Sequence, residues 1–346
     1  MKKLLSFAAA LFVLLSCFAP ATAEAGKISV VTTIFPIDDW VREIVGANDH
    51  VDVSILLDSG VDLHSYQPTV QDILKVSTAD VFAFVGGESD EWVEGALAEA
   101  ANKDMKVVNL VEAMGEDIKM EEIVEGMEHE HDHDHDKDDH DHDEDDHDHD
   151  EDEHDHDHEH EHEHEHEEEA DEHVWLSLRN AQKLVAALTD ALCKEDPADA
   201  EAFRANAAAY IEKLAALDAQ YSEAVNSAAF RTILFGDRFP FRYLADDYGL
   251  DYFAAFSGCS AESEASFATI VFLAGKVDEL GLPTVLTIEN PRTRIAQTIV
   301  ESTQAKNQKI LSLDSMQGTT AADIAAGATY LGIMESNLAV LRDALN

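Results

Sequence analysis

Short apolar runs alternate with stretches of helical periodicity in residues 24–127, which we expect to form a first lobe. The β-branched runs predict buried strands at 27–34, 51–57, 79–85 and 105–110. Apolar residues three and four positions apart predict helices over 35–45 and 91–101. Strands that alternate with helices predict a parallel sheet that is covered on both faces.

A long helical region follows in residues 173–228. Apolar spacing predicts one helix over 177–193 and a second over 198–224, with a break near Pro197. At 1.5 Å per residue the second helix would span about 40 Å, which is longer than one small domain needs. We therefore expect it to run between two lobes.

The same strand and helix alternation returns in residues 229–346. Strands are predicted at 231–236, 250–256, 284–288 and 309–313. Helices are predicted at 239–248, 266–280, 293–303 and 321–345. The predicted fold class is α/β, with two α/β lobes of mostly parallel sheets joined by a long rigid helix. Ligands bind at the carboxyl edge of such sheets, so we expect a cleft between the lobes.

Residues 128–172 interrupt this pattern with a tract of histidine and acidic residues. The tract holds 15 histidines, 28 acidic residues and one lysine, and so carries 27 of the 49 net negative charges. It has no large apolar residue to offset the entropy of ordering, so we expect disorder. Alternating imidazoles and carboxylates offer exchangeable ligands to divalent metals, whereas a plain acidic spacer needs no histidine. The predicted accessory metal ligands are His129, His131, His133, His135, His140, His142, His147, His149, His154, His156, His158, His160, His162, His164 and His166.

The N-terminus predicts a signal peptide over residues 1–23. Its apolar run, residues 4–18, is too short to span a bilayer and is typical of an h-region. Two processing outcomes compete: a lipobox-like segment ending at Cys17 predicts lipid attachment there, and an A-x-A site ending at Ala23 predicts release. In both cases the mature chain is exported and works outside the cytoplasmic membrane, either lipid-anchored or periplasmic and secreted.

The net charge limits the classes of binding partner, and the cysteine content limits the possible disulfides. The net charge of −49 argues against a nucleic-acid partner, because the protein would repel phosphates. Cys193 and Cys259 remain after the signal peptide, and in an oxidising compartment they could form a disulfide. Two buried free thiols are the alternative, since the sequence does not show whether the two residues meet.

Three histidines lie outside the acidic tract. His50 lies in a turn before a strand and is assigned to the surface. His64 lies in a loop after the second strand, at the expected cleft edge, and His173 directly follows the tract. Two histidines in loops beside one cleft, in a chain with a metal-collecting tract, predict an inner metal site.

The sequences around these two histidines are distinctive. Residues 60–69 read GVDLHSYQPT and resemble the loop G-x-D-P-H-x-Y-x-P-T, while residues 171–180 read DEHVWLSLRN and resemble D-P-H-V-W-L-D-P-x-N. Both motifs belong to the substrate-binding proteins of zinc and manganese ABC importers (the ZnuA/AdcA type), whose zinc members typically carry an acidic, histidine-rich insertion before the second motif. The resemblance implies two lobes joined by a rigid helix and a metal held between them by His64 and His173.

The chain departs from this family at the third ligand. The family offers His or Glu at the start of a segment like H-D-A-F-G-Y-F-A-x-x-Y-G-L, where this chain reads GDRFPFRYLADDYGL from Gly236. The register allows Asp237 or Arg238, and because arginine cannot bind a cation, Asp237 is the candidate. The alternative is that both residues pair with neighbours and leave the site open. The family's late D-S-M-like turn implies Asp314 as fourth ligand, with Glu289 in reserve.

Two imidazoles and two carboxylates suit tetrahedral Zn²⁺, and Mn²⁺ is the alternative, with more oxygen ligands. The affinity order and the histidine tract favour zinc. The resemblance implies a monomeric solute-binding protein that captures Zn²⁺ and delivers it to an ABC importer permease in the membrane. A zinc enzyme is disfavoured, because H-E-x-x-H, G-x-S-x-G, Walker and dinucleotide motifs are lacking. A passive extracellular metal buffer or adhesin would not need two specific loops at one cleft.

Overall fold

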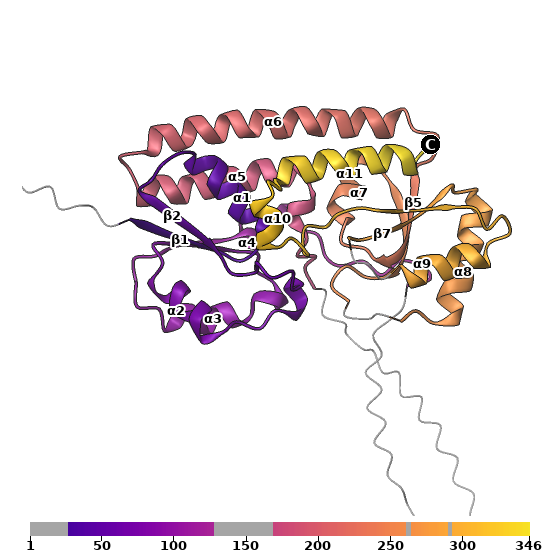
Figure 1. Ribbon diagram of the computed structural model, residues 1–346, viewed down its shortest axis with the longest axis horizontal. Coiled ribbons are helices and arrows are strands. Elements are labelled where there is room, and N and C mark those ends of the chain that lie inside the picture. Colours follow the sequence, from indigo (N-terminus) through magenta and orange to yellow (C-terminus); the bar gives the residue numbers. More distant parts are fainter. Residues whose placement is uncertain (1–26, 128–168, 261–263, 290–292) are drawn as a thin grey trace, which may run out of the picture.

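Two α/β lobes lie side by side beneath one long helix (Figure 1), which confirms the predicted fold class. The structure, a computed structural model, describes residues 27–127, 169–260, 264–289 and 293–346. The predicted signal peptide, Cys17 and the fifteen tract histidines lie outside the described residues. Within the described part of the chain, no helix is both long enough and apolar enough to cross a membrane.

The N-terminal lobe contains a four-stranded parallel sheet in the order β2-β1-β3-β4. Its strands are β1 (Ile28–Thr32), β2 (Val51–Ile55), β3 (Val81–Phe84) and β4 (Lys106–Asn109). Its helices are α1 (Phe35–Val45), α2 (Val70–Thr78), α3 (Trp92–Ala98) and α4 (Leu110–Met114). All four residues of the central strand β3 are buried, as expected for a parallel strand covered on both faces.

The C-terminal lobe repeats this arrangement with the strand order β6-β5-β7-β8, again parallel. Its strands are β5 (Thr232–Arg238), β6 (Asp251–Phe256), β7 (Thr284–Thr287) and β8 (Lys309–Ser312). Its helices are α7 (Arg242–Tyr248), α8 (Phe267–Leu280) and α9 (Arg294–Ser302). The carboxyl ends of β5 and β6 lead into the loops that face the other lobe.

The two lobes share one apolar core through the helices above them. Helix α5 (Leu178–Glu195) packs on the N-terminal sheet, and α6 (Ala200–Asn226), with 27 residues, runs across both lobes (Figure 1). A single buried cluster continues from Trp40 through Tyr221 to Phe241. The Tyr221 hydroxyl also donates to the Met334 carbonyl at 2.6 Å. This continuous packing couples the lobes more firmly than an exposed linker would.

The C-terminal helix differs from the prediction. The expected single helix over 321–345 is wrong, because the structure has two, α10 (Ala321–Ala325) and α11 (Tyr330–Ala344). Gly327 between them has φ +97°, a left-handed conformation that does not continue a helix. The Thr329 side chain then caps α11 by accepting from the Gly332 N–H.

The last residues of the acidic tract, 169–172, lie within the described part of the chain. The Glu121 N–H donates to the Glu169 carbonyl at 2.7 Å, and Ala170 forms an antiparallel bridge with Met120. Asp171 and Glu172 are 3% and 2% exposed. Composition suggested disorder here, but these acidic residues have specific partners in the fold.

A buried carboxylate ties α1 to α11 and makes stability depend on pH. Asp39 Oδ2 accepts from the Tyr330 N–H at 3.0 Å and from the Tyr210 hydroxyl at 3.5 Å. Burial raises the pKa of Asp39 from 3.8 to about 6, with Glu43 and Asp38 adding repulsion. The folded state therefore holds this proton more tightly than the unfolded state, and the resulting stabilisation is lost as pH rises from about 4 to about 6.

We expect Asp39→Asn to reduce this pH dependence, because an amide has no such proton to lose. The fall in unfolding free energy between pH 4 and 6 should shrink by about 1–3 kcal/mol. Urea unfolding at a series of pH values measures it. Asp49→Asn, which changes an exposed carboxylate in the turn after α1, is the matched control. Parallel pH profiles for wild type and Asp39→Asn would contradict the assignment.

Candidate metal centre

His64 is positioned by a short turn at the carboxyl edge of the N-terminal sheet. The turn, Leu63–Ser65, is capped by Asp62, whose carboxylate accepts from the His64 N–H at 3.1 Å. The ring Nδ1 lies 2.8 Å from Ser89 Oγ and 3.6 Å from Glu172 Oε2. With Nδ1 engaged on this side, Nε2 is left to face His173.

His173 is fully buried and is held by the residue two positions before it. Asp171 Oδ1 accepts from the His173 backbone N–H and lies 2.9 Å from the ring Nδ1. A carboxylate oxygen accepts hydrogen bonds, so this contact assigns the hydrogen to Nδ1 and leaves Nε2 as the nitrogen that could bind a metal. Such a carboxylate–histidine pair is typical of imidazoles that bind metals.

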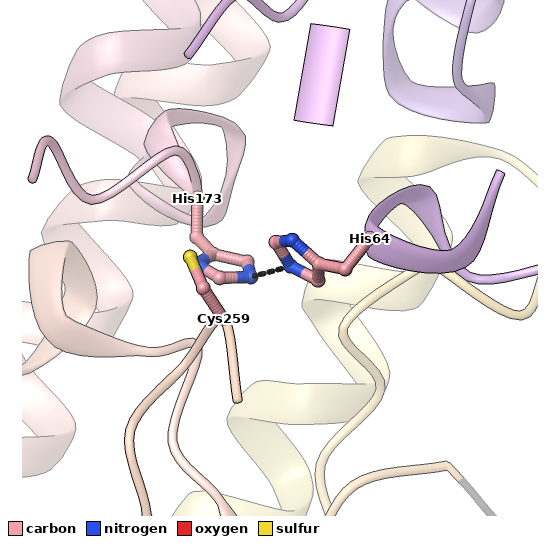
Figure 2. Close-up of side chains that lie close together, drawn as sticks. All are labelled: His64, His173 and Cys259. Carbon is pink, nitrogen blue, oxygen red and sulfur yellow. Dashed lines mark hydrogen bonds between the residues drawn. The ribbon is translucent and has the colours of Figure 1, made fainter. Parts of the chain in front are cut away.

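The structure brings these two predicted residues together. Their Nε2 atoms lie 3.1 Å apart, and Figure 2 shows the two rings with these atoms facing each other. Two nitrogens, each at roughly 2.0–2.1 Å from a tetrahedral zinc ion, would be about 3.3 Å apart. The spacing therefore suits two ligands of one ion with little movement of either ring.

A third donor, Cys259, comes from the C-terminal lobe and was not predicted as a ligand. Its sulfur and the donor atoms of His64 and His173 all lie within 4.8 Å of one another (Figure 2). Cys259 follows the carboxyl end of β6, where a ligand is expected in such sheets, and that position was the available signal.

The disulfide that we considered is not formed, since Cys193 and Cys259 are both free thiols. Cys193 is buried in α5, where its thiol lies 3.5 Å from the Ala200 carbonyl oxygen at the start of α6. Cys259 instead lies next to the two histidines. The alternative of two free thiols is therefore the one that the structure adopts.

Asp237 lies outside this three-donor group. Its Oδ1 accepts from the Arg238 N–H at 2.9 Å, and its Oδ2 accepts from the Ile288 N–H at 3.4 Å. The Arg238 guanidinium reaches the other lobe and donates to Asp62 Oδ2 at 2.5 Å. Both residues thus pair with neighbours, which is the alternative that the sequence left open.

Asp314 and the reserve carboxylate Glu289 also lie outside the three-donor group that the described residues form. Glu289 accepts from the backbone N–H groups of residues 315, 317 and 318 and from the Ser315 hydroxyl. Asp314 accepts from the Met316 N–H at 2.7 Å, and burial together with Glu289 raises its pKa to about 6. Glu289 therefore stabilises the turn after β8 through its hydrogen bonds.

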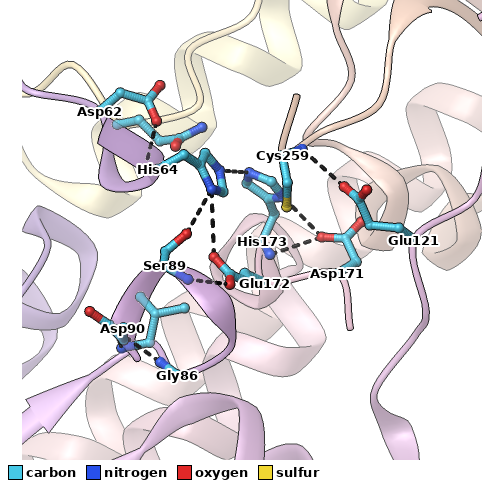
Figure 3. A network of polar contacts seen from close by, with 12 residues as sticks. Asp62, His64, Gly86, Ser89, Asp90, Glu121, Asp171, Glu172, His173 and Cys259 are labelled. Carbon is cyan, nitrogen blue, oxygen red and sulfur yellow. Dashed lines mark hydrogen bonds and ion pairs between the residues drawn. The ribbon is translucent and has the colours of Figure 1, made fainter. Parts of the chain in front are cut away.

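The electrostatics around the group favour a neutral His64. Burial, helped by His173 and Arg238 and opposed by Asp62, lowers the pKa of His64 to about 3. Burial also raises the pKa of the Cys259 thiol, as do the carboxylates of Glu121, Glu172 and Asp171, which Figure 3 shows around the site. These surroundings therefore favour a neutral His64 imidazole and a protonated Cys259 thiol.

Comparisons with known proteins agree with this architecture. Residues 30–344 match the family described as "Zinc-uptake complex component A periplasmic", ZnuA. The chain is 33% identical over 339 residues to the zinc-binding lipoprotein AdcA of Streptococcus pneumoniae, covering 98% of this chain and 60% of that protein. It is 29% identical over 347 residues to the high-affinity zinc uptake system protein ZnuA of Bacillus subtilis, covering 97% of each.

Solved structures show the same fold. The zinc-bound ZnuA-like domain of Streptococcus pneumoniae AdcA has a TM-score of 0.67 at 27% identity, covering 92% of this chain and 99% of that one. The metal-dependent lipoprotein YcdH of Bacillus subtilis has a TM-score of 0.68 at 26% identity, covering 92% and 100%. The chain spans about three fifths of the full AdcA relative. With the family match over nearly the whole chain, these likenesses confirm the predicted resemblance: the protein belongs to the ZnuA family of zinc-uptake complex components.

Proposed function

We propose that this protein is an exported solute-binding protein that captures Zn²⁺ between its lobes and delivers it to an ABC importer permease. The observation that carries the proposal is the 3.1 Å approach of the His64 and His173 Nε2 atoms. Each ring has an acceptor at Nδ1, Ser89 for His64 and Asp171 for His173. The zinc-binding relatives favour zinc over the alternative, manganese.

The acidic tract acts in this proposal as an outer collector. The tract begins directly after Met127, and the described chain resumes at Glu169, beside Glu121, whose side chain contacts the loop of Cys259. Many weak, fast-exchanging ligands at this point raise the local concentration of zinc near the cleft. An unperturbed imidazole has a pKa of about 6.5, so we expect the collector to bind zinc more weakly as pH falls below that value.

Release to the permease requires the ligand loops or the lobes to move apart. The shared core under α6 restricts the lobes, so we expect a small rigid displacement rather than a wide hinge motion. The Arg238–Asp62 ion pair joins the lobes next to His64 and would have to break in such a movement.

Titration calorimetry with zinc and manganese tests the proposal. One mature protein is intact, and in the other a short Gly-Ser linker replaces residues 128–168. We expect both to keep one tight zinc site and only the intact protein to show further weak sites, because the inner donors lie outside the tract. If the replacement removes all tight binding, the cleft is not the metal site and the protein is a metal buffer.

A further inference from the structure

The loop that carries Cys259 is fixed on both sides of the thiol. At Gly258, a Cβ atom would lie 3.0 Å from His173 Cε1, so the missing side chain lets the loop approach the imidazole. The Cys259 N–H donates to Glu121 Oε1 at 2.9 Å, and the Ser260 carbonyl accepts from Arg238 at 3.5 Å. The sulfur is therefore held at the two histidines by the backbone around it.

The charged side chains of the C-terminal lobe that lie near the two histidines are engaged in other contacts. The Arg238 guanidinium approaches His64 from the C-terminal lobe and forms an ion pair with Asp62, the residue that caps the His64 turn. Asp62 neutralises that charge, but its carboxylate is then engaged by the guanidinium. Asp237 and Asp314 are hydrogen-bonded outside the donor group. Within the described residues, Cys259 is the C-terminal-lobe donor that reaches both imidazoles.

We propose that Cys259 is the third zinc ligand, as a thiolate, in a His₂Cys site that selects zinc over manganese; this rests on the proposed zinc-binding function. Zinc binding forms the Zn–S bond and breaks the S–H bond, and the proton leaves through the adjacent Glu121 carboxylate to solvent. Thiolate is a soft ligand that suits zinc, whereas manganese prefers oxygen donors. Cys259 thus takes the place of the family's third ligand, and it comes from a different loop of the same lobe.

The test uses the full mature chain with one equivalent of zinc, and Cys259→Ser and Cys259→Ala variants. X-ray absorption at the zinc edge should show one sulfur neighbour at about 2.3 Å in the wild type and none in Cys259→Ser. Zinc affinity should fall by more than the roughly 10- to 100-fold that losing an outer-shell partner causes. Manganese affinity should change less, so the zinc-to-manganese affinity ratio falls. Cys193→Ala, which removes the other thiol from α5, should match wild type.

The outcomes distinguish a failure of the Cys259 proposal from a failure of the proposed zinc-binding function. A zinc-loaded wild type without a sulfur neighbour overturns the thiolate ligand, even when the tight site is present. Tight zinc binding by Cys259→Ala at wild-type affinity overturns it as well. A wild type that lacks any tight zinc site refutes the proposed function instead. If neither Cys259 variant folds, as judged by circular dichroism, the sulfur signal of the wild type decides alone.

Discussion

His64→Ala is expected to abolish tight zinc binding while leaving the fold intact. The substitution removes one of two imidazoles whose Nε2 atoms lie 3.1 Å apart, and no other described histidine lies in the donor group. The loss should be at least 100-fold in affinity, or about 3 kcal/mol. Competition with a chelator of known zinc affinity measures it, in protein with residues 128–168 replaced so that the tract does not mask the effect.

His50→Ala is the matched control for this experiment. His50 lies in the turn after α1 with its side chain 68% exposed, which confirms its predicted surface position. The same chemical change there should leave zinc affinity unaltered. Equal losses in both variants, or a His64→Ala protein that still binds zinc tightly, would refute the assignment of His64 to the centre.

Zinc should also stabilise the folded protein in a way that depends on His64. A ligand that binds only the folded state adds about 2.7 kcal/mol at one hundred times its Kd. The wild type should therefore unfold at a higher temperature with zinc than with a chelator, and His64→Ala should not.

Periodicity predicted most of the fold because the sheets are parallel and buried. Each of the eight strands of the described residues overlaps a predicted apolar run, and α1 has the bounds that its apolar spacing indicated. Helix α2 was missed, because Val70 and Leu74 are exposed and the helix is set by a capping box between Thr69 and Asp72.

The site could be predicted only in part, because its members come from distant segments. His64 and His173 each carry a local motif, and the structure brings them together. Cys259 has no such motif, and its role depends on the loop after β6 reaching across to His173. Asp237 was a reasonable candidate by register, but the Ile288 N–H, from β7's carboxyl end, binds its carboxylate. Contacts of that kind follow from tertiary structure and leave no local pattern.

The second motif also anchors the His173 turn in the core. The segment after His173 places Trp175 in the core, fully buried, with its indole N–H donating to the Ser315 carbonyl at 2.9 Å. The Trp175 carbonyl accepts from the Tyr330 hydroxyl at 2.7 Å. One residue therefore connects the His173 turn to the turn after β8 and to α11. Because the His173 and Trp175 ring centroids are 5.2 Å apart, this packing also supports the imidazole.

Trp175→Ala is accordingly expected to cause the largest loss of stability, about 3–5 kcal/mol, because it opens a cavity and leaves the Ser315 carbonyl unpaired. Urea unfolding of the zinc-free protein, followed by circular dichroism, measures the loss. Trp175→Phe keeps most of the ring packing and removes the N–H, so it should cost only about 1–3 kcal/mol. Zinc affinity should decrease more in Trp175→Ala than in Trp175→Phe, because the phenyl ring still packs against His173. A loss below about 1 kcal/mol in Trp175→Ala would show that the lobes do not depend on this contact.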